Sequence, residues 1–330
     1  MREALFYEEI GEADDVQCHL CPHHCIVKEG DAGLCKVRKN EGGVLYSLAY
    51  GKISSLANDP IEKKPLYHFH PGTKILSVGS WGCNFTCPWC QNWEIVTQKP
   101  PLQKVTPDRL IDIAIDREMD GIAYTYNEPI VSFEFVLDTS RMSNADGIYN
   151  VMVTNGYIEE APLKLLLQTI QAMNIDLKGF SSSFYKKRCS GELKVVKKNI
   201  ETIYNEGLHL ELTTLVIPGE NDTEKEMEEE TKWIASLSPE IPLHLSAYHP
   251  AHRFQKPPTS DEKMMALYKI AKKNLDYVYI GNTMVDEGRN TYCPNCSNLL
   301  IERSGFSAKV VGITEDKKCE KCREDIKVKL

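Results

Sequence analysis

The sequence predicts an α/β fold: a partial (β/α)6 barrel with an N-terminal cysteine-rich extension and a small C-terminal metal-binding module. Apolar, strand-like runs alternate with helical stretches at a spacing of roughly 30 residues, as in parallel strands joined by right-handed crossovers. Eleven of the twelve cysteines fall into three groups, located before, within and after this repeating region. We therefore expect three parts, at residues 1–72, 73–290 and 291–330.

The strands of the barrel are expected to begin after residue 73. Thr106-Pro107-Asp108 predicts a helix start, because Thr can cap the helix and Pro fits its first turn. Apolar residues at helical spacing predict further helices at 193–205 and 223–237. Six strand–helix units favour an open barrel over the eight units of a complete one. Strands are predicted at 74–79, 122–126, 149–154, 173–177, 209–217 and 243–248, with a further candidate at 278–282.

The N-terminal extension contains a group of four cysteines. Short spacings with intervening Gly and Pro predict a closed metal site. Zinc is one occupant, because tetrahedral sites made of four cysteines are commonly structural, and a second [4Fe–4S] cluster is the other. Alternating apolar residues predict a strand at 44–50, and residues 59–66 are expected to form a loop. The four cysteines are Cys18, Cys21, Cys25 and Cys35.

The C-terminal region interrupts the strand–helix alternation with two CxxC pairs. Their spacing predicts a zinc-ribbon or rubredoxin-like module built from short β-hairpins. So short a module needs a stabilising link, which favours a closed structural zinc site over an electron-transfer iron site, although the spacing itself does not choose the metal. The four ligands expected are Cys293, Cys296, Cys319 and Cys322.

Composition and charge narrow the classes of protein to consider. With 26% charged and 42% hydrophobic residues among 330, the chain resembles an ordinary soluble globular protein. A net charge of −8 argues against a broad basic surface for nucleic acid. The first residues lack the apolar core of a secretory signal, and no apolar run approaches a membrane span. We expect a cytoplasmic protein, not bound to membrane, whose grouped cysteines bind metal rather than form disulfides.

The central cysteine group carries the most specific chemistry. Within residues 82–92, Cys83, Cys87 and Cys90 have the spacing CxxxCxxC. Most iron–sulfur electron carriers use four cysteines per cube. Three thiolates would leave one iron of a [4Fe–4S] cluster open to a substrate or cofactor. The group therefore predicts chemistry at the cluster rather than simple electron storage.

This loop, with Trp89 before its last cysteine, resembles the signature of the radical S-adenosylmethionine (radical SAM) superfamily. The barrel region is similar to the pyruvate formate-lyase-activating-enzyme group of that superfamily. The resemblance implies that the open iron binds the methionine moiety of S-adenosylmethionine, and that the aromatic ring packs toward its adenine. It makes Cys83, Cys87 and Cys90 the cluster ligands.

The same resemblance implies roles for polar residues at the ends of later strands. Asn127-Glu128 corresponds to the family's Gly-Gly-Glu motif, although the glycines are absent here. Some of these roles have a structural alternative: a helix-start acid for Glu128, an ion pair for Asp176 and Lys178, and a plain loop residue for His249. The implied cofactor-binding residues are Trp89, Asn127, Glu128, Thr154, Asn155, Asp176, Lys178 and His249, with Asp176, Lys178 and His249 also catalytic.

A more specific likeness extends over most of the chain. Residues 17–25, 59–66, the cysteine loop and 124–129 together resemble the AmmeMemoRadiSam-system radical SAM enzymes, an activating-enzyme-like subfamily. The resemblance does not settle the substrate.

The expected function is that of a radical SAM oxidoreductase. The resemblance implies reductive cleavage of S-adenosylmethionine at the [4Fe–4S] cluster, giving a 5′-deoxyadenosyl radical that abstracts hydrogen from a substrate. It favours a protein or peptide substrate, a ferredoxin or flavodoxin as electron donor, and an anaerobic setting. Two alternatives are an RNA-modifying radical SAM enzyme, which the acidic charge disfavours, and a non-catalytic multi-zinc binding protein.

Overall fold

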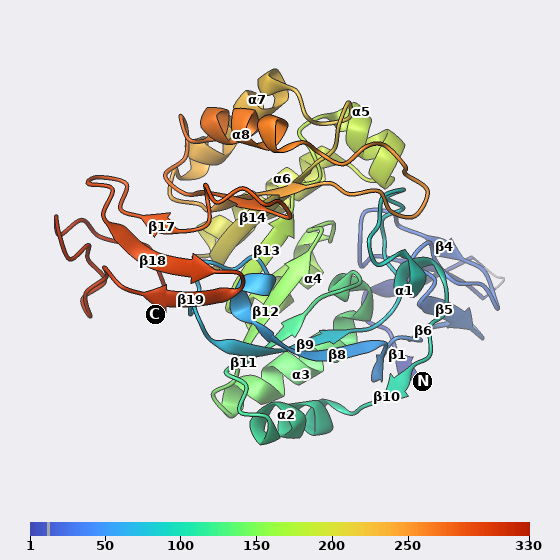
Figure 1. Ribbon diagram of the computed structural model, residues 1–330. Coiled ribbons are helices and arrows are strands. Elements are labelled where there is room, and N and C mark those ends of the chain that lie inside the picture. The colour runs from blue at the N-terminus through green and yellow to red at the C-terminus, as the bar shows by residue number, and fades with distance from the viewer. Residues whose placement is uncertain (12–13) are drawn as a thin grey trace.

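The computed structural model describes residues 1–11 and 14–330, and an eight-stranded sheet lies at its centre (Figure 1). The strand order is β16-β15-β14-β13-β12-β11-β9-β8. The seven strands from β9 to β16 are parallel, and β8 is antiparallel at the edge. The strands are β8 (Ser55–Pro60), β9 (Lys74–Gly79), β11 (Gly121–Tyr124), β12 (Tyr149–Thr154), β13 (Ala172–Asp176), β14 (His209–Val216), β15 (Leu243–Ala247) and β16 (Val278–Gly281).

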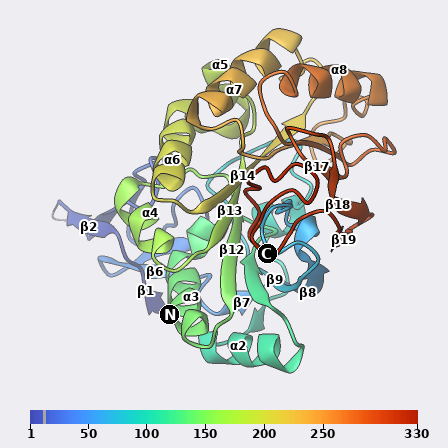
Figure 2. The ribbon, with the colours of Figure 1, turned by 90° about the vertical axis from the view of Figure 1, so that its left-hand side faces the viewer.

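Helices cover the outer face of this curved sheet (Figures 1 and 2). Their apolar faces and the outward side chains of the strands form one large buried cluster, which includes Leu76, Leu110, Val196 and Met264. Burial of this kind is the main stabilising contribution in such folds. The helices are α1 (Trp93–Thr97), α2 (Pro107–Asp116), α3 (Phe133–Ala145), α4 (Glu160–Leu167), α5 (Ser182–Phe184), α6 (Leu193–Asn205), α7 (Glu224–Leu237) and α8 (Asp261–Ala271).

The predicted α/β fold with a central parallel sheet is confirmed. The six predicted strands and the further candidate at 278–282 all occur, so the sheet has seven parallel strands rather than six. Helix α6 spans the predicted residues 193–205, and α7 begins one residue after the predicted start. Helix α2 begins at Pro107 as expected, but the Thr106 side chain makes no capping hydrogen bond.

The prediction of a loop at residues 59–66 is wrong for its first part. Strand β8 continues to Pro60, and a 3₁₀ turn (Ile61–Lys63) follows it. Asp59 lies on the last part of β8, where its carboxylate binds Lys63 at 2.9 Å and the buried Lys64 at 2.8 Å. The Tyr126 hydroxyl donates a third bond to the same carboxylate at 2.9 Å. Paired charges therefore replace the apolar alternation that would have identified this strand.

The segment after β8 fills the base of the barrel. Ile61, Leu66 and Phe69 form a buried apolar cluster with side chains of β9, β11, β12 and β13. The Glu211 carboxylate on β14 accepts the backbone N–H groups of Tyr67 and His68, at 3.0 and 2.7 Å. The segment is thus fixed from the strand side by both apolar packing and hydrogen bonds.

The C-terminal module packs against this same segment. It is a three-stranded antiparallel sheet of β17 (Thr291–Tyr292), β18 (Leu299–Ser304) and β19 (Ser307–Val310). Arg303 places its guanidinium over the Tyr67 ring and donates to the Tyr67 carbonyl at 2.7 Å. Lys329 exchanges backbone hydrogen bonds with His68 and His70, at 2.9 and 2.7 Å. The module therefore helps to hold the base of the barrel in place.

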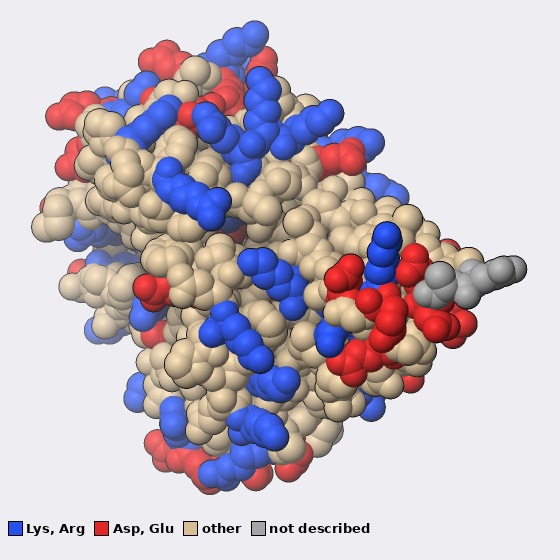
Figure 3. Space-filling view, turned by 90° about the vertical axis from the view of Figure 1, so that its right-hand side faces the viewer, with Lys and Arg blue, Asp and Glu red and all other residues tan. Residues whose placement is uncertain are grey.

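The N-terminal strands form small sheets on the opposite side of the barrel from the C-terminal module (Figure 1). A buried ion pair between Arg38 and Glu134 ties this part to α3, with 2.9 Å between Nη1 and Oε1. Figure 3 shows acidic side chains gathered in one part of this side. The remaining strands are β1 (Arg2–Glu3), β2 (Tyr7–Ile10), β3 (Asp15–Cys18), β4 (Ile26–Val27), β5 (Arg38–Glu41), β6 (Val44–Ser47), β7 (Lys52–Ile53) and β10 (Gln103–Lys104).

Among the residues described, no helix has the length and apolar character that crossing a membrane requires.

Candidate active site

The loop that carries Cys83, Cys87 and Cys90 connects β9 to α1, at the carboxyl end of the first parallel strand. Ligands bind at this edge in parallel α/β sheets. Gly82 enters the loop with φ of +80°, a conformation that favours glycine. Phe85 is buried within the loop, and its ring leaves no room for a side chain at Gly191. The cysteines are therefore presented by a loop anchored through its interior residues.

Asn127 holds the start of this loop. Its Oδ1 accepts the Ser80 N–H at 2.8 Å. Its Nδ2 lies 3.1 Å from each of the carbonyl oxygens of Trp81, Gly82 and Glu128. The side chain is only 9% exposed. Its polar atoms are thus engaged with backbone, which makes Asn127 a positioning residue for the cysteine loop.

Glu128 lies beside Asn127 and is also buried. Its Oε1 accepts the Thr154 hydroxyl at 2.6 Å and the Ile130 N–H at 3.0 Å, and its Oε2 accepts the Asn155 N–H at 2.8 Å. Burial raises the pKa of Glu128 to about 7, although these donors favour the ionised form. The structure thus brings together three predicted site residues at the ends of β11 and β12.

Asn155 extends the cluster to the cysteines. Its Nδ2 donates to Asn84 Oδ1 at 2.8 Å and lies 3.9 Å from Cys83 Sγ. The Phe85 N–H also points to Cys83 Sγ, at 3.3 Å. Burial raises the pKa of Cys83, with Glu128 adding to the effect, so the thiol is protonated at neutral pH unless a metal binds it. Two donors near one sulfur fit a thiolate that ligates metal.

Asp176 and Lys178 form a partly exposed ion pair at the end of β13, with 2.7 Å between Oδ2 and Nζ. Burial by itself would lower the pKa of Lys178, but Asp176 and the nearby Cys87 thiolate raise it well above its ordinary value. The ammonium therefore stays charged near the cysteine loop. This predicted pair lies on the same edge as the loop and Glu128.

Trp89 and His249 lie at the edge of this group. The Trp89 ring is buried and stacks on Phe184 at 5.4 Å between centroids, with Phe254 edge-on at 5.7 Å. His249 is exposed, and its Nε2 lies 3.0 Å from the Asn282 carbonyl oxygen. Its own carbonyl accepts Gln91 Nε2 at 3.3 Å, so the histidine follows β15 close to the cysteine loop.

The C-terminal cysteines form a compact group. The sulfur atoms of Cys293, Cys296, Cys319 and Cys322 all lie within 4.8 Å of one another. Cys293 lies 3.5 Å from Cys322, and Cys296 lies 3.6 Å from Cys319. A tetrahedral zinc site with Zn–S bonds of about 2.3 Å has sulfur atoms about 3.8 Å apart. The geometry fits one metal ion, and the cluster is enclosed by the apolar side chains of the module.

Three contributors to the site were not identified from the sequence. Asn84 lies inside the cysteine motif and joins Asn155 to the Tyr157 carbonyl, which its Nδ2 reaches at 2.8 Å. Cys189, to which the sequence assigned no role, is fully buried next to Cys87, and its thiol lowers the pKa of Cys87. Asp59 accepts the Tyr126 hydroxyl at 2.9 Å, and the Tyr126 carbonyl accepts Nδ2 of Asn92, at the end of the cysteine loop, at 2.7 Å. Asn84 lies within the cysteine motif, and Asp59 and Tyr126 lie in segments that carry the subfamily resemblance, whereas Cys189 offered no sequence signal.

Comparison with known proteins agrees with this geometry. A sequence profile of the Radical SAM superfamily matches residues 79–231, which include the cysteine loop and the carboxyl ends of five parallel strands. The chain belongs to the radical SAM superfamily. An uncharacterized protein of Methanocaldococcus jannaschii is similar to this radical SAM protein over 100% of both chains, at 46% identity.

More distant relatives place this radical SAM protein near the activating enzymes. The pyruvate formate-lyase-activating enzyme of Clostridium pasteurianum is 20% identical over 63% of this chain and 82% of its own. Among solved structures, Streptococcus suis SuiB bound to the precursor peptide SuiA has a TM-score of 0.52 at 12% identity. That alignment covers 68% of this chain and 51% of SuiB, and it shows the shared fold alone.

The loop fits the cofactors of this superfamily. Its three sulfur atoms do not all lie within 4.8 Å of one another, unlike those of the C-terminal group. Wider spacing suits thiolates that each bind a different iron of a cube. Membership of the superfamily implies a [4Fe–4S] cluster and S-adenosylmethionine.

Proposed function

We propose that the chain is a radical SAM enzyme of the activating-enzyme type, which abstracts a hydrogen atom from a polypeptide substrate. The observation that supports this most is the convergence of Cys83, Glu128, Asn155 and the Asp176–Lys178 pair at one edge of the parallel sheet. When bound, the cluster and S-adenosylmethionine supply one-electron cleavage of the sulfonium to methionine and a 5′-deoxyadenosyl radical. The protein supplies binding, orientation and exclusion of side reactions.

Cys83, Cys87 and Cys90 would hold the cluster. Donors near Cys83, from Phe85 N–H and Asn155 Nδ2, stabilise its thiolate. Glu128 would act on S-adenosylmethionine rather than on the cluster. Glu128 places a buried carboxylate beside the loop, which favours binding of a cationic amino group.

The Asp176–Lys178 pair offers both charges at the open edge of the site. We assign Lys178 to the carboxylate of the cofactor, because its ammonium remains charged and is 19% exposed. Asp176 is 32% exposed and holds the Lys178 ammonium in place. We assign Trp89 to the adenine side and His249 to the sulfonium side of the cofactor, from their places in the loop and after β15.

The relative from Clostridium pasteurianum supports a polypeptide substrate, because it is named as the activating enzyme of a protein, pyruvate formate-lyase. A ferredoxin or flavodoxin would supply the electron, because reduction of such a cluster needs a low-potential donor.

The C-terminal ion, zinc or iron, is proposed to be structural, since its module packs on the base of the barrel away from the cysteine loop (Figure 1). We also propose a cytoplasmic location and an anaerobic setting, because a reduced exposed cluster is sensitive to oxygen.

Anaerobic purification, reconstitution and reduction with dithionite in the presence of S-adenosylmethionine test the proposal. We expect 5′-deoxyadenosine in the wild type and none in Cys87→Ala, measured by chromatography. Asn205→Ala is the control, since Asn205 is exposed at the end of α6 and is not part of the candidate site. A wild type with a full cluster and no 5′-deoxyadenosine would refute the proposed chemistry, and an active Cys87→Ala would refute the ligand assignment.

The polypeptide proposal needs a separate measurement. Incubation of the reduced enzyme with extract of the source organism, followed by mass spectrometry of peptides, should reveal modified residues that are absent with Cys87→Ala. A modified nucleoside in digested RNA, without modified peptides, would favour the RNA-modifying alternative instead.

A further inference from the structure

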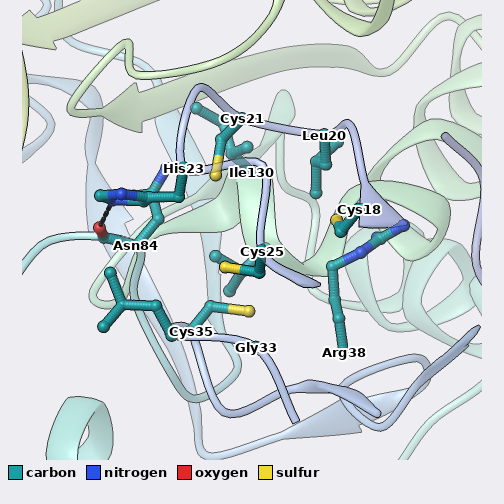
Figure 4. Close-up of a pocket in the computed structure, with 12 residues that line it drawn as sticks. Cys18, Leu20, Cys21, His23, Cys25, Gly33, Cys35, Arg38, Asn84 and Ile130 are labelled. Atoms are coloured by element: carbon teal, nitrogen blue, oxygen red, sulfur yellow. Dashed lines mark hydrogen bonds between the residues drawn. The ribbon is translucent and has the colours of Figure 1, made fainter. Parts of the chain in front are cut away.

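The N-terminal cysteines surround a pocket next to the candidate active site. Cys18 ends β3, Cys21 and Cys25 lie in the turn before β4, and Cys35 lies shortly before β5. Figure 4 shows all four around one space. The loop residue Asn84 and residues 130–131, shortly after Glu128, also line it.

The spacing of these cysteines distinguishes them from the C-terminal group. In a tetrahedral zinc site, sulfur atoms lie about 3.8 Å apart. The C-terminal sulfurs meet this spacing, but no three of Cys18, Cys21, Cys25 and Cys35 have sulfur atoms within 4.8 Å of one another. The sulfur atoms of Cys83, Cys87 and Cys90 likewise do not all lie within 4.8 Å of one another. In a [4Fe–4S] cluster each thiolate binds its own iron, so four separated sulfurs around a pocket fit a cube better than a single ion.

The pocket also has a buried positive charge. Arg38 lines it and is only 2% exposed. Its Nη1 pairs with Glu134, and its Nη2 donates to the Leu5 carbonyl. Its Nε–H has no hydrogen-bond partner among the described residues. A buried donor on a guanidinium suits an occupant with sulfur acceptors and net negative charge, as a cube with four thiolates has.

The pocket and the active-site loop share a wall. A side chain at Gly82 would place its Cβ 2.5 Å from the Cys35 carbonyl oxygen, so only glycine allows this approach. His23 Nε2 lies 2.7 Å from the carbonyl oxygen of Asn84, the residue bonded to Cys83 (Figure 4). The path from Cys21 to Cys83 therefore crosses two residues, Pro22 and His23, one hydrogen bond and Asn84.

We propose that Cys18, Cys21, Cys25 and Cys35 hold a second [4Fe–4S] cluster that passes electrons to the cluster of the active-site loop. A low-potential carrier protein, of the ferredoxin or flavodoxin class, gives one electron and takes the second cluster from the 2+ to the 1+ state. The second cluster returns to 2+ as the loop cluster goes from 2+ to 1+. No bond breaks and no proton moves. The presence of the second cluster is independent of the proposed function, whereas the relay rests on it.

The first experiment asks what the pocket binds. In the triple variant Cys83→Ala/Cys87→Ala/Cys90→Ala, reconstituted anaerobically, we expect about four irons and four sulfides per chain beyond the C-terminal ion. The reduced variant should give the electron paramagnetic resonance signal of a [4Fe–4S]+ cluster. The quadruple variant Cys18→Ala/Cys21→Ala/Cys25→Ala/Cys35→Ala should lose that cluster and keep the one in the loop.

The metal content of the wild type provides a measurement that no substitution can disturb. About eight irons per chain, beyond the C-terminal ion, support two clusters. Zinc in the N-terminal site, with about four irons in total, would overturn the proposal. So would a triple variant that folds, as its circular dichroism shows, and contains no cluster.

The second experiment tests the relay by the rate of reduction of the loop cluster, followed by rapid-freeze electron paramagnetic resonance. With reduced flavodoxin as donor, we expect at least a tenfold slower rate in the quadruple variant than in the wild type. With dithionite, which is small enough to reach the loop directly, the two rates should be similar. Equal rates with flavodoxin would overturn the relay. Loss of 5′-deoxyadenosine formation in a wild type with both clusters reduced would instead refute the proposed function.

Discussion

Removal of the Asn127 side chain tests whether this residue supports the cysteine loop or binds S-adenosylmethionine directly. In the structure its amide bonds the Ser80 N–H and three carbonyl oxygens at the start of the cysteine loop. Asn127→Ala leaves the buried Ser80 N–H without its acceptor, which costs about 1–3 kcal/mol. The carbonyl oxygens also lose their donor, so we expect a total loss of about 2–4 kcal/mol in the free energy of unfolding.

The assay is urea unfolding under anaerobic conditions, on samples matched for iron content. Asn205→Ala is the control, because Asn205 is exposed at the end of α6 and its substitution should change stability by no more than about 0.5 kcal/mol. We also expect Asn127→Ala to lose iron from the loop faster than the control when a chelator is added, because the loop has lost its support.

The result that would refute this reasoning is specific. If Asn127 served mainly as a direct ligand of S-adenosylmethionine, Asn127→Ala would bind the cofactor more weakly while its unfolding and iron retention matched those of Asn205→Ala. Isothermal titration with S-adenosylmethionine, beside the unfolding curves, distinguishes the two.

Three further predictions concern buried charges and the C-terminal metal. Asp59→Asn should destabilise the fold by about 3–5 kcal/mol in urea unfolding, because it leaves the buried Lys64 ammonium without its partner; an unchanged midpoint would contradict the ion pair. Burial raises the pKa of Glu230 to about 8, so the folded state binds the extra proton between about pH 4.5 and 8 and its stability falls as pH rises through that range. Glu230→Gln should lack this fall of about 3–5 kcal/mol, and parallel pH profiles for the two proteins would contradict the assignment. Cys296→Ser should lose one metal ion per chain by elemental analysis and unfold at lower urea, whereas full metal content would exclude Cys296 as a ligand.

The parallel strands were predictable because they are apolar runs bounded by turns. Strand β12 occupies the predicted residues 149–154, and β14 ends one residue early. Strand β8 was missed because its Asn-Asp-Pro sequence resembles a turn, and Asp59 is stabilised there by Lys64, Lys63 and Tyr126, which no local pattern reveals. Periodicity thus identifies strands that bury apolar side chains, and it fails where the interior is lined by paired charges.

The candidate site was also predictable from the sequence only in part. The spacing of the loop cysteines specified a metal site locally, and the strand ends placed Glu128 and Asn155 on the same edge of the sheet. The function of the Asn127 amide depended on backbone groups of residues 80–82, which lie more than forty positions earlier. Such long-range partners do not appear in the sequence around Asn127, so its contacts with the cysteine loop could not be predicted.

The contact between the C-terminal module and the base of the barrel has a consequence for biosynthesis. Proteins are made from the N-terminus, at about 5–20 residues per second, and their parts generally fold in that order. Tyr67 and His68 are made early, but Arg303 and Lys329, which bind them, emerge more than two hundred residues later. The base of the barrel therefore waits for a late partner whose four cysteines fit one metal ion. Cells short of that metal should accumulate newly made chains with an unfinished barrel, exposed to proteases, before any shortage becomes apparent at the iron–sulfur sites.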